Sequence, residues 1–255
     1  MAKTANPLAS RFERSLGVLK NRLIWRGVGE CGTGKTFFGL GAPGPIVVQS
    51  FDRGLEGVNL SAYNEKDIYP IEYEWAPTTE LSQEAAIELR DKFIEDHEYA
   101  LKHARTILVD KETDVWEIFR YGEFGEPNDS PRNYPALNQR YRKLVNMAKS
   151  TDVNIGWIQS MKDEWKTVNK KKLSGEVVQA GAATGNRVAQ GFGELEGLVH
   201  INLFHRRENG KFLIDVGKAR GPASTDVQDQ TFTNLTFVEF AQLVFPDTNE
   251  EDWQS

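Results

Sequence analysis

The sequence predicts an α/β fold in which helices flank a mostly parallel central sheet and an antiparallel strand pair lies toward the C-terminus. Short apolar segments suited to buried strands recur along the chain, and segments with helical periodicity separate several of them. A glycine-rich turn also joins a first predicted strand, in residues 21–28, to a predicted helix in residues 36–41. Strands that are separated by helices in this way pair in parallel, which sets the fold class.

The glycine-rich turn has the sequence GECGTGKT and satisfies the pattern G-x-x-x-x-G-K-[ST] at every fixed position. Its glycines let successive backbone N–H groups point at phosphate groups, its lysine neutralises the terminal phosphates, and its threonine can ligate Mg²⁺. We therefore predict a cradle for ATP and Mg²⁺. Its residues are Gly29, Glu30, Cys31, Gly32, Thr33, Gly34, Lys35 and Thr36.

Three further apolar segments end in a polar residue, and the carboxyl ends of parallel strands meet at one edge of a sheet. Residues 105–110 end in Asp110, which we predict to hold Mg²⁺ together with Thr36. Residues 44–52 end in Asp52, a candidate for orienting or deprotonating the attacking water, and Glu112 competes for that role. Gln159, at the end of residues 152–159, is expected to sense the terminal phosphate and to pass the signal to the adjoining segment.

The remaining pattern predicts helices and one domain. Residues 78–103 and 136–150 have helical periodicity, residues 236–245 suit a last short helix, and residues 122–135 suit a turn-rich mobile segment. In the first helix, the side chains expected to face the sheet are Leu81, Ala85, Leu89, Phe93 and Tyr99. We predict an N-terminal extension over residues 1–20, an ATPase domain over residues 21–246 and an acidic, disordered tail over residues 247–255.

Composition excludes several classes of protein. The 255 residues carry a formal charge of −6, so contacts to nucleic acid must come from a local patch or from surfaces assembled between subunits. The single cysteine, Cys31, allows no intrachain disulfide and no thiolate metal cluster. With no signal-like segment and no apolar run approaching the ~20 residues of a membrane span, we expect a cytoplasmic protein with no membrane partner.

Residues 161–190 are first basic and then rich in glycine and alanine, which predicts a long functional loop. Lysines that bind phosphates and a tryptophan on which bases stack are typical of single-stranded DNA binding. A solvated flexible loop is the alternative. The candidate DNA-binding residues are Lys162, Trp165, Lys166, Lys170, Lys171 and Lys172.

In their order, the motifs GECGTGKT, IVVQSFD, TILVD, IGWIQ and VGKAR resemble those of the RecA-like recombinase ATPases. They resemble more closely the small RecA-like ATPases of phages that are associated with single-strand annealing. The resemblance covers residues 21–222. It implies a RecA-like P-loop NTPase that hydrolyses ATP, with Asp52 in the place of the family's catalytic glutamate and residues 161–190 as a DNA-binding loop.

The resemblance also implies an oligomer, either a ring or a filament. Lys218 and Arg220 match the place where recombinases carry two basic residues that reach the nucleotide of a neighbouring subunit. The implied partners are therefore single-stranded DNA and further copies of the chain, with a single-strand DNA-binding protein as another candidate, in the host cytoplasm of a phage-encoded protein. Two alternatives stay open: an assembly or DNA-loading module with little hydrolysis, and a helicase-like motor.

Overall fold

The computed structural model describes residues 21–56, 58–63, 66–75, 82–125, 134–171, 177–221 and 224–253. The predicted N-terminal extension therefore lies outside the described residues, as do Leu81, Lys172 and most of the segment predicted to be mobile. Within the described ranges, no helix combines the length and apolar character that crossing a membrane requires.

An eight-stranded sheet forms the centre of the molecule, in the order β10-β9-β8-β1-β5-β4-β2-β3. The strands from β8 to β3 in this order run parallel to one another. At one edge of the sheet β9 pairs antiparallel with β8, and β10 pairs antiparallel with β9. The mostly parallel sheet and the C-terminal antiparallel pair are thus confirmed. Its strands are β1 (Ile24–Gly29), β2 (Ile46–Ser50), β3 (Ile68–Glu72), β4 (Thr106–Asp110), β5 (Asn154–Gln159), β8 (Ile201–Glu208), β9 (Lys211–Ala219) and β10 (Thr231–Thr233).

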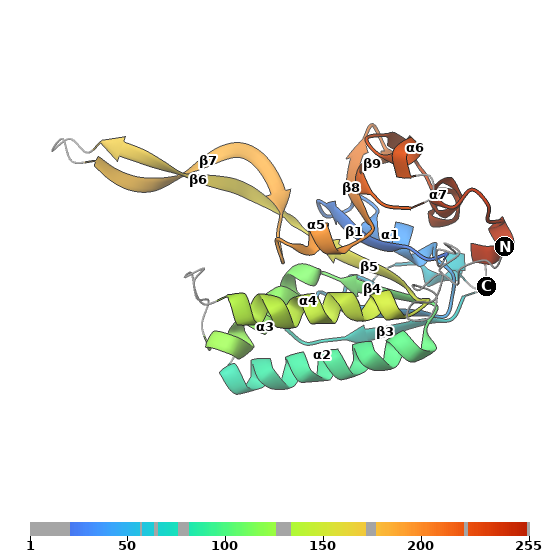
Figure 1. Ribbon diagram of the computed structural model, residues 1–255, viewed down its shortest axis with the longest axis horizontal. Helices are drawn as coiled ribbons and strands as arrows, with labels where there is room; N and C mark the ends of the chain where they lie inside the picture. The colour runs from blue at the N-terminus through green and yellow to red at the C-terminus, as the bar shows by residue number, and fades with distance from the viewer. Residues whose placement is uncertain are drawn as a thin grey trace, which may run out of the picture.

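Helices cover both faces of this sheet (Figure 1). The long helix α2 (Gln83–His103) lies on one face with α3 (Glu112–Phe124) and α4 (Pro135–Met147), and α1 (Lys35–Leu40) lies on the other with α7 (Phe237–Val244). Each face has its own apolar core. Short helical turns complete the fold: α5 (Leu195–Leu198), α6 (Ser224–Val227), η2 (Leu60–Tyr63), η4 (Ala148–Ser150) and η5 (Glu250–Trp253).

Side chains of complementary size pack the two faces of the central strands. Trp25 of β1 is fully buried and lies across β5 at Gly156, where an added Cβ would come within 2.4 Å of the indole ring. Trp157 of β5 is fully buried on the opposite side of the sheet, within the core beneath α3 and α4. The apolar runs that predicted these strands are buried on both faces, as parallel strands under helices must be.

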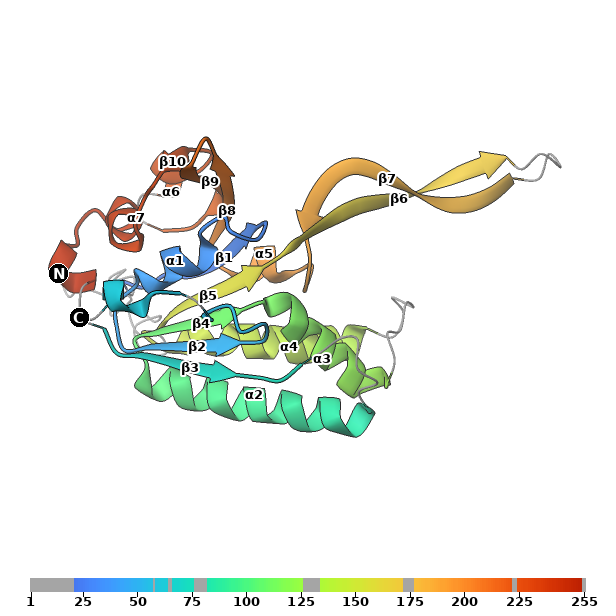
Figure 2. The ribbon, with the colours of Figure 1, turned by 180° about the vertical axis from the view of Figure 1, so that it is seen from behind.

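The prediction of a long loop over residues 161–190 is wrong. These residues form a two-stranded antiparallel ribbon, in which β6 (Met161–Lys171) pairs with β7 (Val177–Ala189) and extends far from the body of the protein (Figure 2). Backbone hydrogen bonds between the two strands need no hydrophobic core, so a segment poor in large apolar side chains can still be regular. We call this ribbon the arm.

The prediction of a disordered C-terminal tail is wrong for residues 247–253. The indole of Trp253 is 1% exposed, lies 5.7 Å from the ring of Phe245 between centroids, and donates a hydrogen bond to Thr248 Oγ1 at 2.9 Å. Acidic composition favours disorder only when no large apolar group anchors the segment. Here one tryptophan docks the tail against α7.

Helix α2 is shorter than predicted, and its buried face agrees only in part with the predicted one, since Leu89 packs partly buried against the core but Tyr99 does not. The helix begins at Gln83, and the Ser82 side chain caps its N-terminus by accepting a hydrogen bond from the Ala85 backbone N–H. Phe93 faces the core as expected, but Tyr99 is 66% exposed and the buried positions include His97 and Ala100. The polar His97 is buried because its Nδ1 lies 2.7 Å from Gln49 Oε1 of β2.

Candidate functional site

The turn between β1 and α1 has the backbone of a phosphate cradle. Gly32 and Gly34 adopt left-handed φ values of 74° and 88°, which residues with a Cβ rarely adopt. Gly29 lies so close to the neighbouring strand β8 that an added Cβ would meet the His205 carbonyl oxygen at 2.4 Å. The fixed glycines of the motif are therefore required by this geometry.

The amine of Lys35 lies in the concave side of this turn. Its Nζ donates hydrogen bonds to the carbonyl oxygens of Gly29 and Glu30, both at 2.8 Å. Burial lowers the pKa of Lys35, and the nearby Asp110 acts against that shift. A partly desolvated ammonium group that bonds to neutral carbonyls can exchange those partners for the oxygens of an anion.

Thr36 and Asp110 meet at the mouth of the turn, although they come from different elements. The Thr36 hydroxyl donates to Asp110 Oδ2 at 3.0 Å. Burial, followed by repulsion from Asp52, raises the pKa of Asp110 to about 6. Two hard oxygen donors, the Thr36 hydroxyl and a carboxylate whose charge is poorly compensated, fit Mg²⁺, which would supply the missing positive charge.

These side chains line one hollow of about 260 Å³ at the carboxyl edge of the sheet. The turn forms one wall, and Asp52, Asp110, Lys111 and Ser160 lie opposite. The register explains the convergence, because Ser50 is paired with Asp110 and Val28 with Gln159. The hollow thus brings together most of the residues predicted to contact phosphate and metal.

Of the two carboxylates that compete for the water-activating role, Asp52 is the one that lines the hollow. Its side chain is 39% exposed, and Oδ2 lies 4.0 Å from Lys111 Nζ. Glu112, in contrast, is fully buried beside the hollow rather than in it. The Tyr141 hydroxyl and the Gln159 amide each donate to Glu112 at 2.6 Å, and the Phe192 backbone N–H donates at 3.3 Å.

This buried cluster of Glu112, Gln159, Tyr141 and the Phe192 backbone was not expected from the sequence. Burial raises the pKa of the Glu112 carboxyl to about 7, and the hydrogen bonds from Tyr141 and Gln159 partly offset that rise. Gln159 is not among the described residues that line the hollow. In the chain it lies two residues before β6, and the Glu112 carboxylate also bridges it to the backbone of Phe192, three residues after β7.

Lys218 and Arg220 lie at the amino-terminal ends of the parallel strands, whereas the glycine-rich turn lies at their carboxyl ends. Ala219 of β9 is paired with Ile201 at the start of β8, and the Arg220 backbone N–H donates to the His200 carbonyl at 2.9 Å. Lys149 lies nearby, and burial together with repulsion from Arg220 and Lys218 lowers its pKa. These basic residues therefore do not belong to the hollow beside the glycine-rich turn.

The predicted DNA-binding residues that the structure describes lie on strand β6 of the arm. Trp165 is 65% exposed and sits over Gly181 of β7, whose added Cβ would touch the indole at 3.5 Å. Lys162 and Lys166 are also exposed, and Lys170 and Lys171 lie farther along β6. The residue paired with Trp165 on β7 is the small Ala183, and the indole is largely open to solvent.

A second hollow, of about 480 Å³, adjoins the first and shares Thr33, Gly34 and Phe37 with it. Aromatic side chains dominate its wall. Phe37 is 53% exposed, Phe212 is 37% exposed, and the Arg207 guanidinium lies 5.2 Å from the centroid of the Phe212 ring. Sequence reasoning missed this wall because Phe212 reaches it from the hairpin β8–β9, far away in the chain.

No protein-family model matches this chain, and no curated protein matches its sequence. Within the described ranges, no group of three or more histidine, cysteine, aspartate or glutamate side chains is placed to hold a metal ion by itself. A metal at Thr36 and Asp110 would therefore complete its coordination with water or with oxygens of a bound ligand, as Mg²⁺ commonly does.

Proposed function

We propose that this chain is a RecA-like, Mg²⁺-dependent ATPase that acts on single-stranded DNA in phage recombination, annealing or replication. The observation that carries the proposal is the convergence of Lys35, Thr36, Asp110 and Asp52 on one hollow at the carboxyl edge of a mostly parallel sheet. Phosphate cradles followed by a helix, with an acidic strand end beside them, are the working parts of P-loop nucleotide hydrolysis.

Each of these residues has a task in the proposed reaction. Lys35 exchanges its carbonyl partners for the terminal phosphates, and Thr36 with Asp110 holds Mg²⁺, which supplies positive charge to the phosphate oxygens when bound. Asp52 orients or deprotonates the attacking water from the open side of the hollow. The aromatic hollow with Phe37 and Phe212 receives the base, for which stacking on exposed rings is favourable.

Gln159 and Glu112 link this site to the arm in the proposal. The buried hydrogen bonds run from Gln159 through the Glu112 carboxylate to the backbone at Phe192, where the chain leaves β7. A change at the hollow that moves Gln159 would change the support of the arm. That geometry supports the coupling of ATP turnover to DNA.

The deciding experiment is steady-state ATP hydrolysis by the purified protein with and without single-stranded DNA, with Lys35→Ala as the control for contaminating ATPase. We expect Lys35-dependent hydrolysis that DNA stimulates. Hydrolysis that depends on Lys35 but is indifferent to DNA would retain the ATPase and reject the DNA coupling. Absence of Lys35-dependent hydrolysis, together with tight ATP binding, would favour an assembly module.

Lysines on the arm should contribute the charge that binds DNA phosphates. Replacing Lys162 and Lys166 together with alanine is expected to weaken binding of single-stranded DNA and to lower the slope of log affinity against log salt by about 1.4. Fluorescence anisotropy of a labelled thymidine oligonucleotide over a salt series measures both effects. An unchanged slope would show that these lysines do not contact the phosphates, and Lys92→Ala on α2 serves as a control.

The position of Lys218 and Arg220 supports action between subunits. Lys218 and Arg220 are turned away from their own hollow by the antiparallel course of β9, so they can approach phosphates only on another copy of the chain. Cations supplied by a neighbour would stabilise charge on the transferred phosphoryl group and would make hydrolysis depend on assembly. The proposed oligomer has head-to-tail contacts, which generate a ring or a filament.

Mixing two inactive variants tests this arrangement. When Lys35→Ala subunits exchange with Arg220→Ala subunits at equal amounts, about a quarter of the head-to-tail interfaces combine an intact Lys35 with an intact Arg220. We expect ATP hydrolysis to rise above that of either variant alone. No recovery, under conditions where labelled wild-type subunits are seen to exchange, would reject action of Arg220 between subunits.

A further inference from the structure

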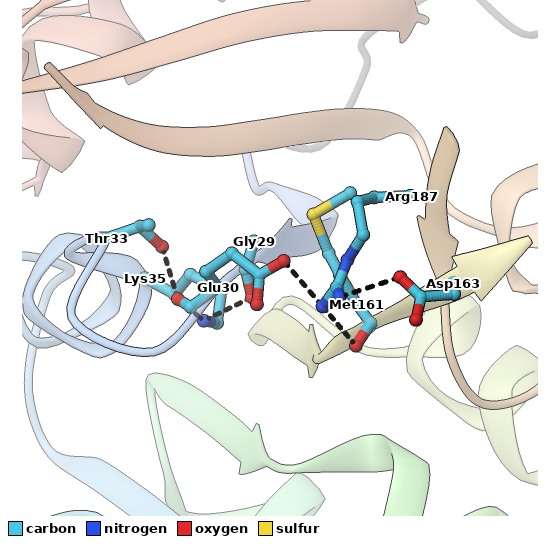
Figure 3. A network of polar contacts seen from close by, with 7 residues as sticks. All are labelled: Gly29, Glu30, Thr33, Lys35, Met161, Asp163 and Arg187. Atoms are coloured by element: carbon cyan, nitrogen blue, oxygen red, sulfur yellow. Dashed lines mark hydrogen bonds and ion pairs between the residues drawn. The ribbon is translucent and has the colours of Figure 1, made fainter. Parts of the chain in front are cut away.

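An ion pair joins the glycine-rich turn to the base of the arm (Figure 3). Arg187, on β7, places Nη2 2.7 Å from the Glu30 carboxylate. The same guanidinium is anchored to β6, because Nη1 lies 3.0 Å from Asp163 Oδ1 and Nη2 donates to the Met161 carbonyl at 3.2 Å. Arg187 therefore connects the turn to both strands of the arm.

Glu30 is tied into the turn by its backbone as well. Its carbonyl oxygen accepts hydrogen bonds from Lys35 Nζ and from the Thr33 hydroxyl, both at 2.8 Å. Glu30 thus touches the phosphate-binding amine on one side and the arm on the other (Figure 3). When Lys35 turns toward phosphates, Glu30 loses one of its hydrogen bonds while its side chain stays paired with Arg187.

The charge on Glu30 is unfavourable for the proposed ligand. A carboxylate in the second position of a phosphate cradle repels a triphosphate, and this repulsion is long-ranged because it acts between full charges. Arg187, which also pairs with Asp163, offsets that charge when the arm is in the position seen here. If the base of the arm moves away, the repulsion returns.

We propose that Arg187 is a positioning residue of the nucleotide site, which neutralises Glu30 and thereby links the position of the arm to nucleotide affinity. The inference rests on the proposed binding of ATP and names a regulation of that same site. By thermodynamic reciprocity, a ligand that shifts the base of the arm changes ATP affinity, and ATP changes the affinity for that ligand by the same factor.

The exposure of the pair indicates that its effect is on the ligand rather than on the fold. The Arg187 and Glu30 side chains are 43% and 54% exposed, and ion pairs this open to water contribute little to folding stability. Their charges are nevertheless felt by a polyanion bound in the adjacent turn. The effect should be largest at low ionic strength and should shrink as salt screens it.

A double-mutant cycle on the full chain tests the inference. Isothermal titration with ATP and Mg²⁺ measures the affinity of the wild type, Arg187→Gln, Glu30→Gln and the double variant at low salt. We expect Arg187→Gln to weaken binding on the order of fivefold, because Glu30 is left unneutralised. Glu30→Gln should bind at least as tightly as the wild type, and the double variant should regain most of the loss.

Rescue by the second substitution separates this role from a structural one, because a merely structural defect would not be repaired by removing Glu30. Arg140→Gln is the matched control, since Arg140 also pairs with a carboxylate, on Glu123, and joins α3 to α4. We expect it to bind ATP as the wild type does. Equal affinity of wild type and Arg187→Gln, or a double variant as weak as Arg187→Gln, would overturn the inference.

The link to the arm is measured by repeating the titration in the presence of a saturating thymidine oligonucleotide. The oligonucleotide should change the ATP affinity of the wild type, and this change should be smaller in Arg187→Gln. A change of the same size in both proteins would overturn the link. If the wild type binds no ATP at all, both this inference and the proposed function fail, whereas equal ATP affinity of the wild type and the three variants rejects the inference alone.

Discussion

Lys35→Ala is expected to lower ATP affinity on the order of 100-fold or more, while the protein keeps its fold. The substitution removes the ammonium group that would pair with the terminal phosphates, and charge-assisted hydrogen bonds of this kind are the strong ones. Among the residues that the structure describes, Lys35 donates hydrogen bonds to the Gly29 and Glu30 carbonyl oxygens of its own turn, so its loss costs the fold little. Isothermal titration with ATP and Mg²⁺ measures the affinity.

Lys66 provides a matched control for this variant. Its Nζ also donates to backbone carbonyls, those of Gly41 and Ala42 at 2.8 Å, at the other end of α1, and burial lowers its pKa as it does for Lys35. Lys66→Ala should lower the melting temperature and retain ATP affinity, whereas Lys35→Ala should lose ATP affinity with little change in the melting temperature. Normal affinity in Lys35→Ala would refute the phosphate cradle.

Glu112→Ala is expected to destabilise the protein on the order of 3 kcal/mol, because three donors would lose their acceptor inside the core. These are the Tyr141 hydroxyl, the Gln159 amide and the Phe192 backbone N–H. Glu112→Gln keeps the shape and should destabilise much less, since a reversed Gln159 amide could offer its buried oxygen, which has no hydrogen bond among the described residues. Urea denaturation measures both variants.

The sign of the pH dependence follows from the raised pKa of Glu112. Its carboxyl has a pKa of about 7 in the folded protein against 4.5 in the unfolded chain, so the folded state holds the proton more tightly. Glu112 therefore stabilises the fold most below pH ~4.5, and this stabilisation is lost as pH rises toward the folded pKa of about 7.

Glu112→Gln removes this dependence. The free energy of unfolding of Glu112→Gln, relative to that of the wild type, should rise by about 3 kcal/mol between pH 4.5 and pH 8. Glu117→Gln, on the same helix but in a half-buried pair with Arg120, is the control. A difference between Glu112→Gln and wild type that does not change with pH would mean that Glu112 ionises normally in the core.

Local signals in the sequence were sufficient for the elements that form the hollow beside the glycine-rich turn. Apolar runs located β1, β4 and β5, and the fixed glycines located the turn whose left-handed backbone at Gly32 and Gly34 only glycine adopts readily. The strand β3 was missed because Ile68–Glu72 contains Pro70 and is only partly buried at the edge of the sheet. Its pattern is too weak to distinguish it from a loop.

The arm shows a different limit of what can be predicted from the sequence. Composition predicted that residues 161–190 build no core, and the basic residues near Trp165 were found, but composition carries no information on whether such a segment pairs with itself. Pairing depends on hydrogen bonds between two backbone strands, which any sequence without proline can make. The C-terminal tail could not be predicted for another reason. Trp253 is buried against Phe237 and Phe245, and this contact depends on the tertiary position of α7.

By itself, the sequence determined the fold class, the glycine-rich turn and the acidic strand ends, because each of these depends on residues that are neighbours in the chain. Tertiary structure alone decided that Asp52 rather than Glu112 faces the hollow, that Gln159 reaches the arm through a buried carboxylate, and that Arg187 pairs with Glu30. These contacts join residues far apart in sequence, and only the register of the strands and the packing of helices on them bring such side chains within hydrogen-bonding distance.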